Sequence, residues 1–327
     1  MPRQGRPPLL IAVLIGVGIV VVQALLVPLF AAPAANLGPR DLPVVVAGPA
    51  PAADALAAQL AQREPGAFEI TRAPDAAAAD AILRDNQAYA AFVMGPAGPA
   101  VHTASGASPT VAQLVGQAAT GMNAQVTDVV PGSPDDPRGA GFASGFLPLA
   151  LTALAAGAAL ALLVRARWAR FTGVLTFGVL AGLVGPLVLQ EWLGVLTGDY
   201  LLNAAAIGLF ATAVAGIVAG LGAAVGRPGI ALAVLLVFLV GNPLSAVSAA
   251  PELLPQPWGA IGQFLPIGAG GSLLRSTAFF DGAGAAAPAW VLGAYALVGL
   301  LLALAGGVRT RTVAAESADA EHVAVAA

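Results

Sequence analysis

The sequence predicts a polytopic α-helical membrane protein. It has six transmembrane helices, an external α/β domain between the first and the second, and a re-entrant hairpin before the last. Hydrophobic residues make up 58% of the 327 residues and charged residues only 9%, whereas a soluble domain is about one-quarter charged. Apolar runs of bilayer-spanning length recur along the chain, and the arginines fall on alternate connections between them.

Several chemistries are excluded by residues that the chain lacks, because it contains no lysine and no cysteine. A P-loop needs a lysine to neutralise the nucleotide phosphates, so we expect no bound cofactor, and ATP would act only through a partner. Disulfides and thiolate metal sites are excluded too. The two histidines, His102 and His322, lie in different segments, and the net charge of −3 gives no sign of nucleic-acid binding.

The first element, residues 1–32, is predicted to be a cytoplasmic N-terminus followed by a transmembrane helix. Leu9–Phe30 is long enough to cross about 30 Å of hydrocarbon as a helix, and Arg3 and Arg6 precede it. A cleaved signal peptide is the alternative, because small residues follow the run. A signal core is only about 7–15 residues long, so we expect an uncleaved anchor.

Residues 33–143 change character, because charged residues return and no run is long enough to span. β-branched or alternating runs predict strands, and runs with helical spacing predict helices. The predicted strands are 41–48, 67–73, 89–95, 100–105 and 126–132, and the predicted helices are 53–64, 75–86 and 109–125. This alternation predicts an α/β domain, which a polar linker joins to the helices that follow.

Residues 144–249 are predicted to hold transmembrane helices two to five, and residues 289–311 the sixth, before a disordered cytoplasmic tail, 312–327. The predicted spans are Phe146–Val164, Phe171–Gln190, Leu201–Val225, Ile230–Ala249 and Ala289–Val308. Arginines occupy the connections at 165–170 and 226–229 and flank both ends, whereas the connection 191–200 is acidic. Short basic connections stay in the cytoplasm. Both termini are therefore predicted to be cytoplasmic in the plasma membrane, with 33–143 extracellular.

Two features inside the spans concern packing. In the fourth span, small residues recur every four positions, which lets another helix approach closely; they are Ala204, Gly208, Thr212, Gly216, Gly220 and Ala224. Chance is the alternative in so alanine- and glycine-rich a chain, and the row does not separate packing within a subunit from packing between subunits. In the fifth span, Asn242 and Pro243 predict a kink towards the bundle interior, because proline removes a helical hydrogen bond.

Residues 250–288 contain apolar runs that are each at most half a span long and that prolines interrupt. Irregular backbone at membrane depth needs shielding by protein or water. We therefore expect a hairpin that enters from the outside and returns, with Arg275 near its outer mouth and reaching the interface. An interfacial loop on the membrane surface is the alternative. The hairpin residues are Pro266, Gly268, Gly270, Gly271 and Arg275.

Three stretches, in their order along the chain, resemble the ABC-2 type transporter permeases, which overlap with the YhgE/Pip-like membrane proteins. They are the anchor followed by DLPVVVAG, the segment FEITRAPDAAAADAILRDNQAYAAFVMGP (68–96), and PELLPQPWGAIGQFLPIGAGGSLLRSTAFFDG (251–282). The resemblance covers nearly the whole chain and depends on order and spacing. It implies a half-transporter in a homodimer or heterodimer, with a separate ABC ATPase on its cytoplasmic loops and the hairpin lining the external exit.

By position, the same resemblance would make RARWAR the ATPase-coupling surface, through Arg165, Arg167, Trp168 and Arg170. The alternative for this motif is a positively charged cytoplasmic anchor with an interfacial tryptophan.

Three functions are compatible with these observations. The first is a permease subunit of an ABC-type exporter for a hydrophobic or amphiphilic substrate, because the spans lack the buried ionisable residues of proton-driven pumps. The second is a non-transporting envelope protein whose external domain binds a partner, as in YhgE/Pip-like or phage-receptor-like proteins. An enzyme is not expected, because the spans contain neither a Ser–His pair nor a carboxylate cluster. Lipid is the remaining expected partner.

Overall fold

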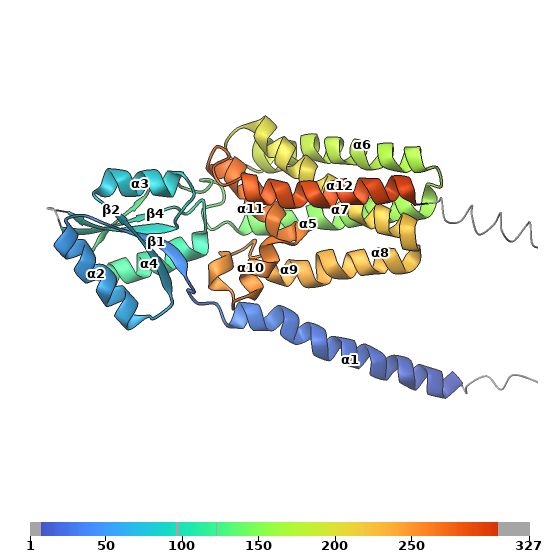
Figure 1. The fold of residues 1–327 in the computed structure, drawn as a ribbon, viewed down its shortest axis with the longest axis horizontal. Coiled ribbons are helices and arrows are strands. Elements are labelled where there is room, and N and C mark those ends of the chain that lie inside the picture. The colour runs from blue at the N-terminus through green and yellow to red at the C-terminus, as the bar shows by residue number, and fades with distance from the viewer. Residues whose placement is uncertain (1–7, 96–97, 122, 307–327) are drawn as a thin grey trace, which may run out of the picture.

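The computed structural model describes residues 8–95, 98–121 and 123–306. They form an α/β domain and a helical bundle that lie end to end (Figure 1). The α/β domain contains β1 (Leu42–Ala47), α2 (Ala50–Arg63), β2 (Phe68–Ala73), α3 (Ala76–Arg84), β3 (Ala90–Gly95), β4 (Gly98–Thr103), α4 (Pro109–Gly121) and β5 (Gln125–Asp128). The segments with strand patterns in the sequence therefore form the strands, and those with helical spacing form the helices.

The five strands make one mixed sheet in the order β2-β1-β3-β4-β5. Strand β1 pairs in parallel with β2 and β3, β3 pairs antiparallel with β4, and β4 pairs in parallel with β5. The run of valines in β1 is buried because helices cover both faces of the sheet. Val44 and Val46 pack towards α2 and α4, and Val45 packs towards α3 on the other face.

The bundle begins after this domain, apart from α1 (Pro8–Ala35), which precedes it. Its elements are α5 (Ala140–Leu163), α6 (Arg167–Pro186), η1 (Leu187–Trp192), α7 (Tyr200–Val225), α8 (Arg227–Val234), η2 (Leu235–Val240), α9 (Gly241–Leu244), η3 (Pro251–Leu253), α10 (Trp258–Gln263), α11 (Pro266–Phe279) and α12 (Ala286–Ala305). The segments η1 and η2 are π-helical, and η3 is a 3₁₀ turn.

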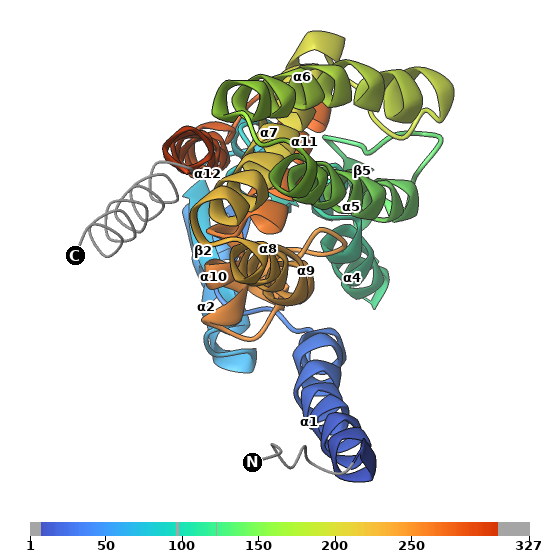
Figure 2. The same ribbon diagram turned by 90° about the vertical axis from the view of Figure 1, so that its right-hand side faces the viewer.

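Within the described part of the chain, six helices are long and apolar enough to cross a membrane, in agreement with the prediction of a multi-pass helical membrane protein. They are Leu9–Ala35, Ala140–Leu163, Arg167–Trp192, Tyr200–Val225, Arg227–Leu244 and Ala286–Ala305. Helix α7 is the central one, because α5, α6, α11 and α12 all pack against it. Helix α1 lies apart from the bundle in both views, touches it mainly near α9, and exposes its apolar side chains along its length (Figures 1 and 2).

The fifth span differs from the expected kinked helix through Ala249. It widens into η2 and ends at Leu244, one residue after Pro243. Pro243 has no N–H to donate to the preceding turn, and the chain leaves the helix at Ala246, whose φ of +54° lies in the left-handed region. Ser245 Oγ donates to the Asn242 carbonyl at 2.7 Å. The predicted break is therefore the end of the helix.

Two segments of the bundle hold the α/β domain from opposite faces of its sheet. Leu253 is buried in the core beneath α2 and α4, and its carbonyl accepts from the Gly38 N–H at 2.9 Å. Phe280, which follows α11, is buried in the core beneath α3. The domain is therefore fixed to the bundle by the same stretch, 249–285, that holds the predicted hairpin.

Candidate functional site

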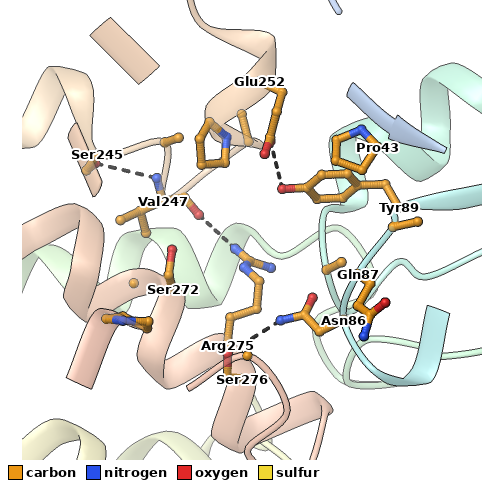
Figure 3. A pocket seen from close by; sticks show the side chains of 18 residues that line it. Pro43, Asn86, Gln87, Tyr89, Ser245, Val247, Glu252, Ser272, Arg275 and Ser276 are labelled. Atoms are coloured by element: carbon orange, nitrogen blue, oxygen red, sulfur yellow. Dashed lines mark hydrogen bonds between the residues drawn. The ribbon is translucent and has the colours of Figure 1, made fainter. Parts of the chain in front are cut away.

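A cavity of about 230 Å³ lies where the α/β domain meets the bundle (Figure 3). Its walls come from the loop before β3, from the segment after α9, from α11 and from the start of α12. The polar side chains that line it are those of Asn86, Gln87, Tyr89, Ser245, Glu252, Ser272, Arg275 and Ser276. The cavity thus collects polar groups from segments almost 200 residues apart in a chain that is otherwise apolar.

Among the residues that the structure describes, Arg275 is the one basic side chain that lines this cavity. Its two terminal nitrogens donate to the carbonyls of Gly106, at 3.1 Å, and Val247, at 2.9 Å. Its guanidinium carbon lies 4.5 Å from the centre of the Phe142 ring, a distance typical of cation–π contacts. Among the described residues, no carboxylate lies within 4.0 Å of its nitrogens.

This placement differs from the expected extension of Arg275 to the membrane interface. The residue does lie at the end of the bundle nearest the α/β domain, but its side chain turns inwards against protein (Figure 3). Two backbone carbonyls and the face of the Phe142 ring contact it there, and both kinds of group interact favourably with a positive charge.

Glu252 and Tyr89 form the opposite wall. The Tyr89 hydroxyl donates to Glu252 Oε2 at 2.9 Å (Figure 3). Burial raises the pKa of the Glu252 carboxyl above its usual value, and the hydrogen bond from Tyr89 opposes part of that rise. Burial, together with the neighbouring carboxylate, also raises the pKa of the Tyr89 hydroxyl. Tyr89 is therefore a neutral donor, and Glu252 is an acceptor with a second oxygen left for other groups.

Asn86 closes the cavity between the two domains. It adopts a φ of +55°, in the left-handed region that asparagine tolerates better than most residues. Its Nδ2 donates to the Ala283 carbonyl at 3.4 Å and lies 3.5 Å from Ser276 Oγ. Ser272 Oγ donates to Gln263 Oε1 at 2.6 Å, which joins α11 to α10.

A second cavity of about 260 Å³ lies between α1 and the end of the fifth span. Helix α1 supplies Phe30, Pro33 and Ala34, and the other side includes Asn242, Pro243 and Leu254. Ser245, Ala246, Val247 and Ala249 line both cavities. The segment 245–249 is therefore a wall between the two cavities, and the second cavity has both apolar and polar lining residues.

The predicted hairpin residues all lie on α11, but they have different surroundings. Only Gly271 and Arg275 line the polar cavity. Pro266 begins the helix, Gly268 faces the Gly262 carbonyl of α10, and a Cβ on Gly270 would lie 2.9 Å from the Phe146 ring. These glycines therefore allow α11, of which 11 of 14 residues are buried, to pack closely inside the bundle.

The predicted coupling residues separate into two groups. Arg165 is exposed on the connection between α5 and α6, and Arg167 and Trp168 are exposed in the first turn of α6. Arg170 is only 6% exposed and donates to the Val164 carbonyl at 2.8 Å and the Ala303 carbonyl at 3.3 Å. Arg170 thus satisfies the carbonyl ends of two neighbouring helices. It is not accessible to a docking partner, contrary to the interpretation of the whole motif as a surface.

The row of small residues on α7 faces two different helices of the same chain. Gly208 and Thr212 lie against Gly178 of α6, whereas Gly216 and Gly220 lie against Gly299 of α12. The sequence did not decide whether this row packs within one subunit or between two. In the structure these four residues lie at contacts inside one chain.

Sequence reasoning missed Asn86, Tyr89 and Glu252, because nothing in the sequence relates them to Arg275. One signal was present, since Glu252 is the only acidic residue between 250 and 280. Among the described residues, no group of three or more His, Asp or Glu side chains could hold a metal ion. No family model, no curated protein and no solved structure matches this chain.

Proposed function

We propose that the chain is the transmembrane permease subunit of an ABC-type exporter for a hydrophobic or amphiphilic substrate, powered by a separate ATPase. The observation that carries the proposal is the broken helix pair α10–α11, of which α11 is buried in the bundle beside the polar cavity whereas α10 keeps Trp258 and Ile261 exposed. Non-helical backbone at membrane depth is tolerated where it is buried in protein or lines a cavity, and transporters build their substrate sites from such interrupted helices.

The orientation follows from the charges at the two ends of the bundle. The α5–α6 and α7–α8 connections lie at the end away from the sheet, as do the start of α1 and the end of α12 (Figure 1). The exposed Arg165, Arg167 and Arg227 lie in or next to these two connections. The positive-inside rule supports a cytoplasmic location for this end of the bundle in a cell membrane. The α/β domain is then extracellular.

The pair α10–α11 is a re-entrant hairpin in this proposal. Its preceding segment contacts the α/β domain at Leu253, and its following residue Phe280 contacts the same domain. Both ends of the pair therefore lie at the outer end of the bundle, which supports entry and return from one side. Graded labelling of single cysteines along 264–275 from outside, with none from inside, is the expected result.

The ATPase would dock on Arg165, Arg167 and Trp168, since these exposed side chains project from a short cytoplasmic connection. Two permease halves would associate through lipid-facing surfaces. One such surface is a shallow groove of about 300 Å³ over the α6–α7 contact, lined by small residues that include Gly178, Gly182 and Gly208.

The second candidate is a non-transporting envelope protein whose external domain binds a partner. The attachment of the α/β domain at both sheet faces favours it, because a fixed platform suits binding. One experiment separates the two candidates. The tagged chain is extracted from its native membrane, and vanadate-sensitive ATP hydrolysis of the purified assembly is measured in lipid nanodiscs.

A permease retains an ATPase subunit whose turnover depends on the chain. Trp168→Ala should reduce both retention and turnover. Trp290→Ala is the matched control. Trp290 is also an exposed tryptophan, but it lies near the start of α12 and not on the proposed docking surface. If no ATPase is retained and no supplied ATPase responds to the chain, the permease proposal fails and the binding platform is favoured.

A further inference from the structure

The polar cavity contains a basic group that forms no ion pair. Arg275 is half-buried, and among the described residues no carboxylate lies within 4.0 Å of its nitrogens, so that Asp136 acts on its charge only from farther away. Charged groups withdrawn from water are normally paired. Its two printed hydrogen bonds use two of the five N–H donors of a guanidinium. An anion that enters the cavity would therefore meet a preformed cation with donors to spare.

The opposite wall of the cavity can accept a hydrogen bond from a ligand. Glu252 Oε2 already accepts from Tyr89, and the carboxyl has a second oxygen. A simple anion would be repelled by this carboxylate whenever it is ionised. A ligand that joins an anionic group to a hydroxyl or ammonium group satisfies Arg275 and Glu252 together.

The size of the cavity sets the size of this polar ligand. Its volume is about 230 Å³, below the roughly 300–1,000 Å³ of pockets that enclose drug-sized ligands. It therefore suits a head group and cannot enclose a lipid with its chains.

The second cavity supplies the place for an apolar chain. It borders α1, most of whose apolar side chains are exposed, and its lining joins the apolar Phe30, Leu37 and Leu254 to the polar Asn242 and Ser248. The wall between the two cavities is the single segment 245–249, which begins where the fifth span stops.

This wall is tied to Arg275 and holds a strained residue. Arg275 donates to the Val247 carbonyl at 2.9 Å (Figure 3). Ala246 adopts a φ of +54°, which costs a residue with a Cβ energy that glycine would not lose. An anion that binds the spare donors of Arg275 and competes with the Val247 carbonyl for the guanidinium would loosen this contact, so that binding of the head group and opening of the wall become linked.

We propose that the two cavities bind one amphiphile, with a phosphate or carboxylate head group that carries a hydroxyl or ammonium donor seated between Arg275 and Glu252, and with its chain in the cleft beside α1. This inference rests on the proposed function, since it names the substrate class of the exporter. It can be tested without an ATPase, so the two proposals can fail separately.

The test measures binding to the purified full-length chain in detergent by native mass spectrometry. The probes are phosphatidylglycerol, which has a phosphate and hydroxyl donors, and phosphatidylcholine, which has a phosphate but no donor. Glycerol 3-phosphate is the head group without chains. We expect one phosphatidylglycerol to bind at least tenfold more tightly than phosphatidylcholine, and glycerol 3-phosphate to bind at least 100-fold more weakly than phosphatidylglycerol.

Two variants make the test specific to the cavity. Arg275→Gln should weaken phosphatidylglycerol binding at least tenfold. Gln87→Glu adds a carboxylate at an exposed position on the cavity lining with almost no change in shape, so it should weaken binding several-fold even if Arg275→Gln does not fold. Arg63→Gln, on an exposed part of α2, is the control and should bind like the wild type.

Equal binding of the two lipids, or wild-type binding by both cavity variants, would overturn the inference. Glycerol 3-phosphate that binds as tightly as phosphatidylglycerol would overturn the assignment of the cleft to an apolar chain. Phosphatidylglycerol binding at Arg275 without any ATPase response would support the lipid-binding inference and contradict the exporter proposal. An ATPase response without such binding would do the reverse.

Discussion

Replacing Gly299 by alanine should force α7 and α12 apart. A Cβ at this position would lie 2.6 Å from the Gly216 carbonyl oxygen and closer still to the adjoining backbone. Ordinary contacts begin at 3.4 Å and the nearest atom, the Gly216 carbonyl carbon, lies at 2.3 Å, so the helices must separate by about 3.4 − 2.3 = 1.1 Å. A gap of 0.5–1 Å loses roughly a quarter to a half of the dispersion energy of each contact. Because backbone cannot rotate away, we expect the cost of overpacking to be about 2–3 kcal/mol.

The assay compares Gly299→Ala with Gly293→Ala in the free energy of unfolding, measured by denaturant titration in mixed micelles. Gly293 lies on the same helix, with no atom within 4 Å of its added Cβ. Both variants gain the same helix propensity, about 1 kcal/mol, so their difference isolates the contact. Equal stability of the two variants would refute a tight α7–α12 contact within one chain.

Three further predictions concern buried groups. Arg170→Gln should lower the free energy of unfolding by about 1–3 kcal/mol, because it leaves helix-end carbonyls unpaired. Arg167→Gln, at an exposed site, should change it by less than about 0.5 kcal/mol. The same denaturant titration measures both variants. Phe280→Ala should destabilise the α/β domain by about 3–5 kcal/mol, seen as faster amide exchange in its strands, whereas Phe264→Ala, at a residue 69% exposed, should not. The pKa of Glu252 in the folded state is raised above its unfolded value of about 4.3. The folded state therefore binds the proton more tightly than the unfolded state. Stability falls as the pH rises from the unfolded pKa through the folded pKa. Melting temperatures between pH 4 and 7 should therefore drop less steeply for Glu252→Gln, and parallel curves would contradict this.

The sequence predicted the elements of this fold better than their contacts. Strand and helix patterns are local, so the valines of β1 and the apolar runs of the six spans could be recognised from spacing alone. The end of the fifth span at Leu244 could not, because Pro243 signals a disturbance without saying whether the helix resumes.

The candidate site could be predicted only in part. Arg275 stood out as a charge in an apolar segment, but its inward direction depends on Phe142, Gly106 and Val247, which the fold brings to it from three other segments. Arg170 was misread for a related reason. An arginine at a helix start is usually solvated, and only the nearby end of α12 explains its burial.

The exporter proposal depends first on which end of the bundle faces the cytoplasm. Because the chain contains no cysteine, single cysteines can replace the exposed Gln62 of α2 and Arg165 of the α5–α6 connection. Both can then be probed on intact cells with a membrane-impermeant maleimide. We predict labelling of Gln62→Cys on intact cells, and labelling of Arg165→Cys only after the membrane is opened. Labelling of Arg165→Cys on intact cells would put the ATPase-docking surface outside the cell and contradict the proposed function.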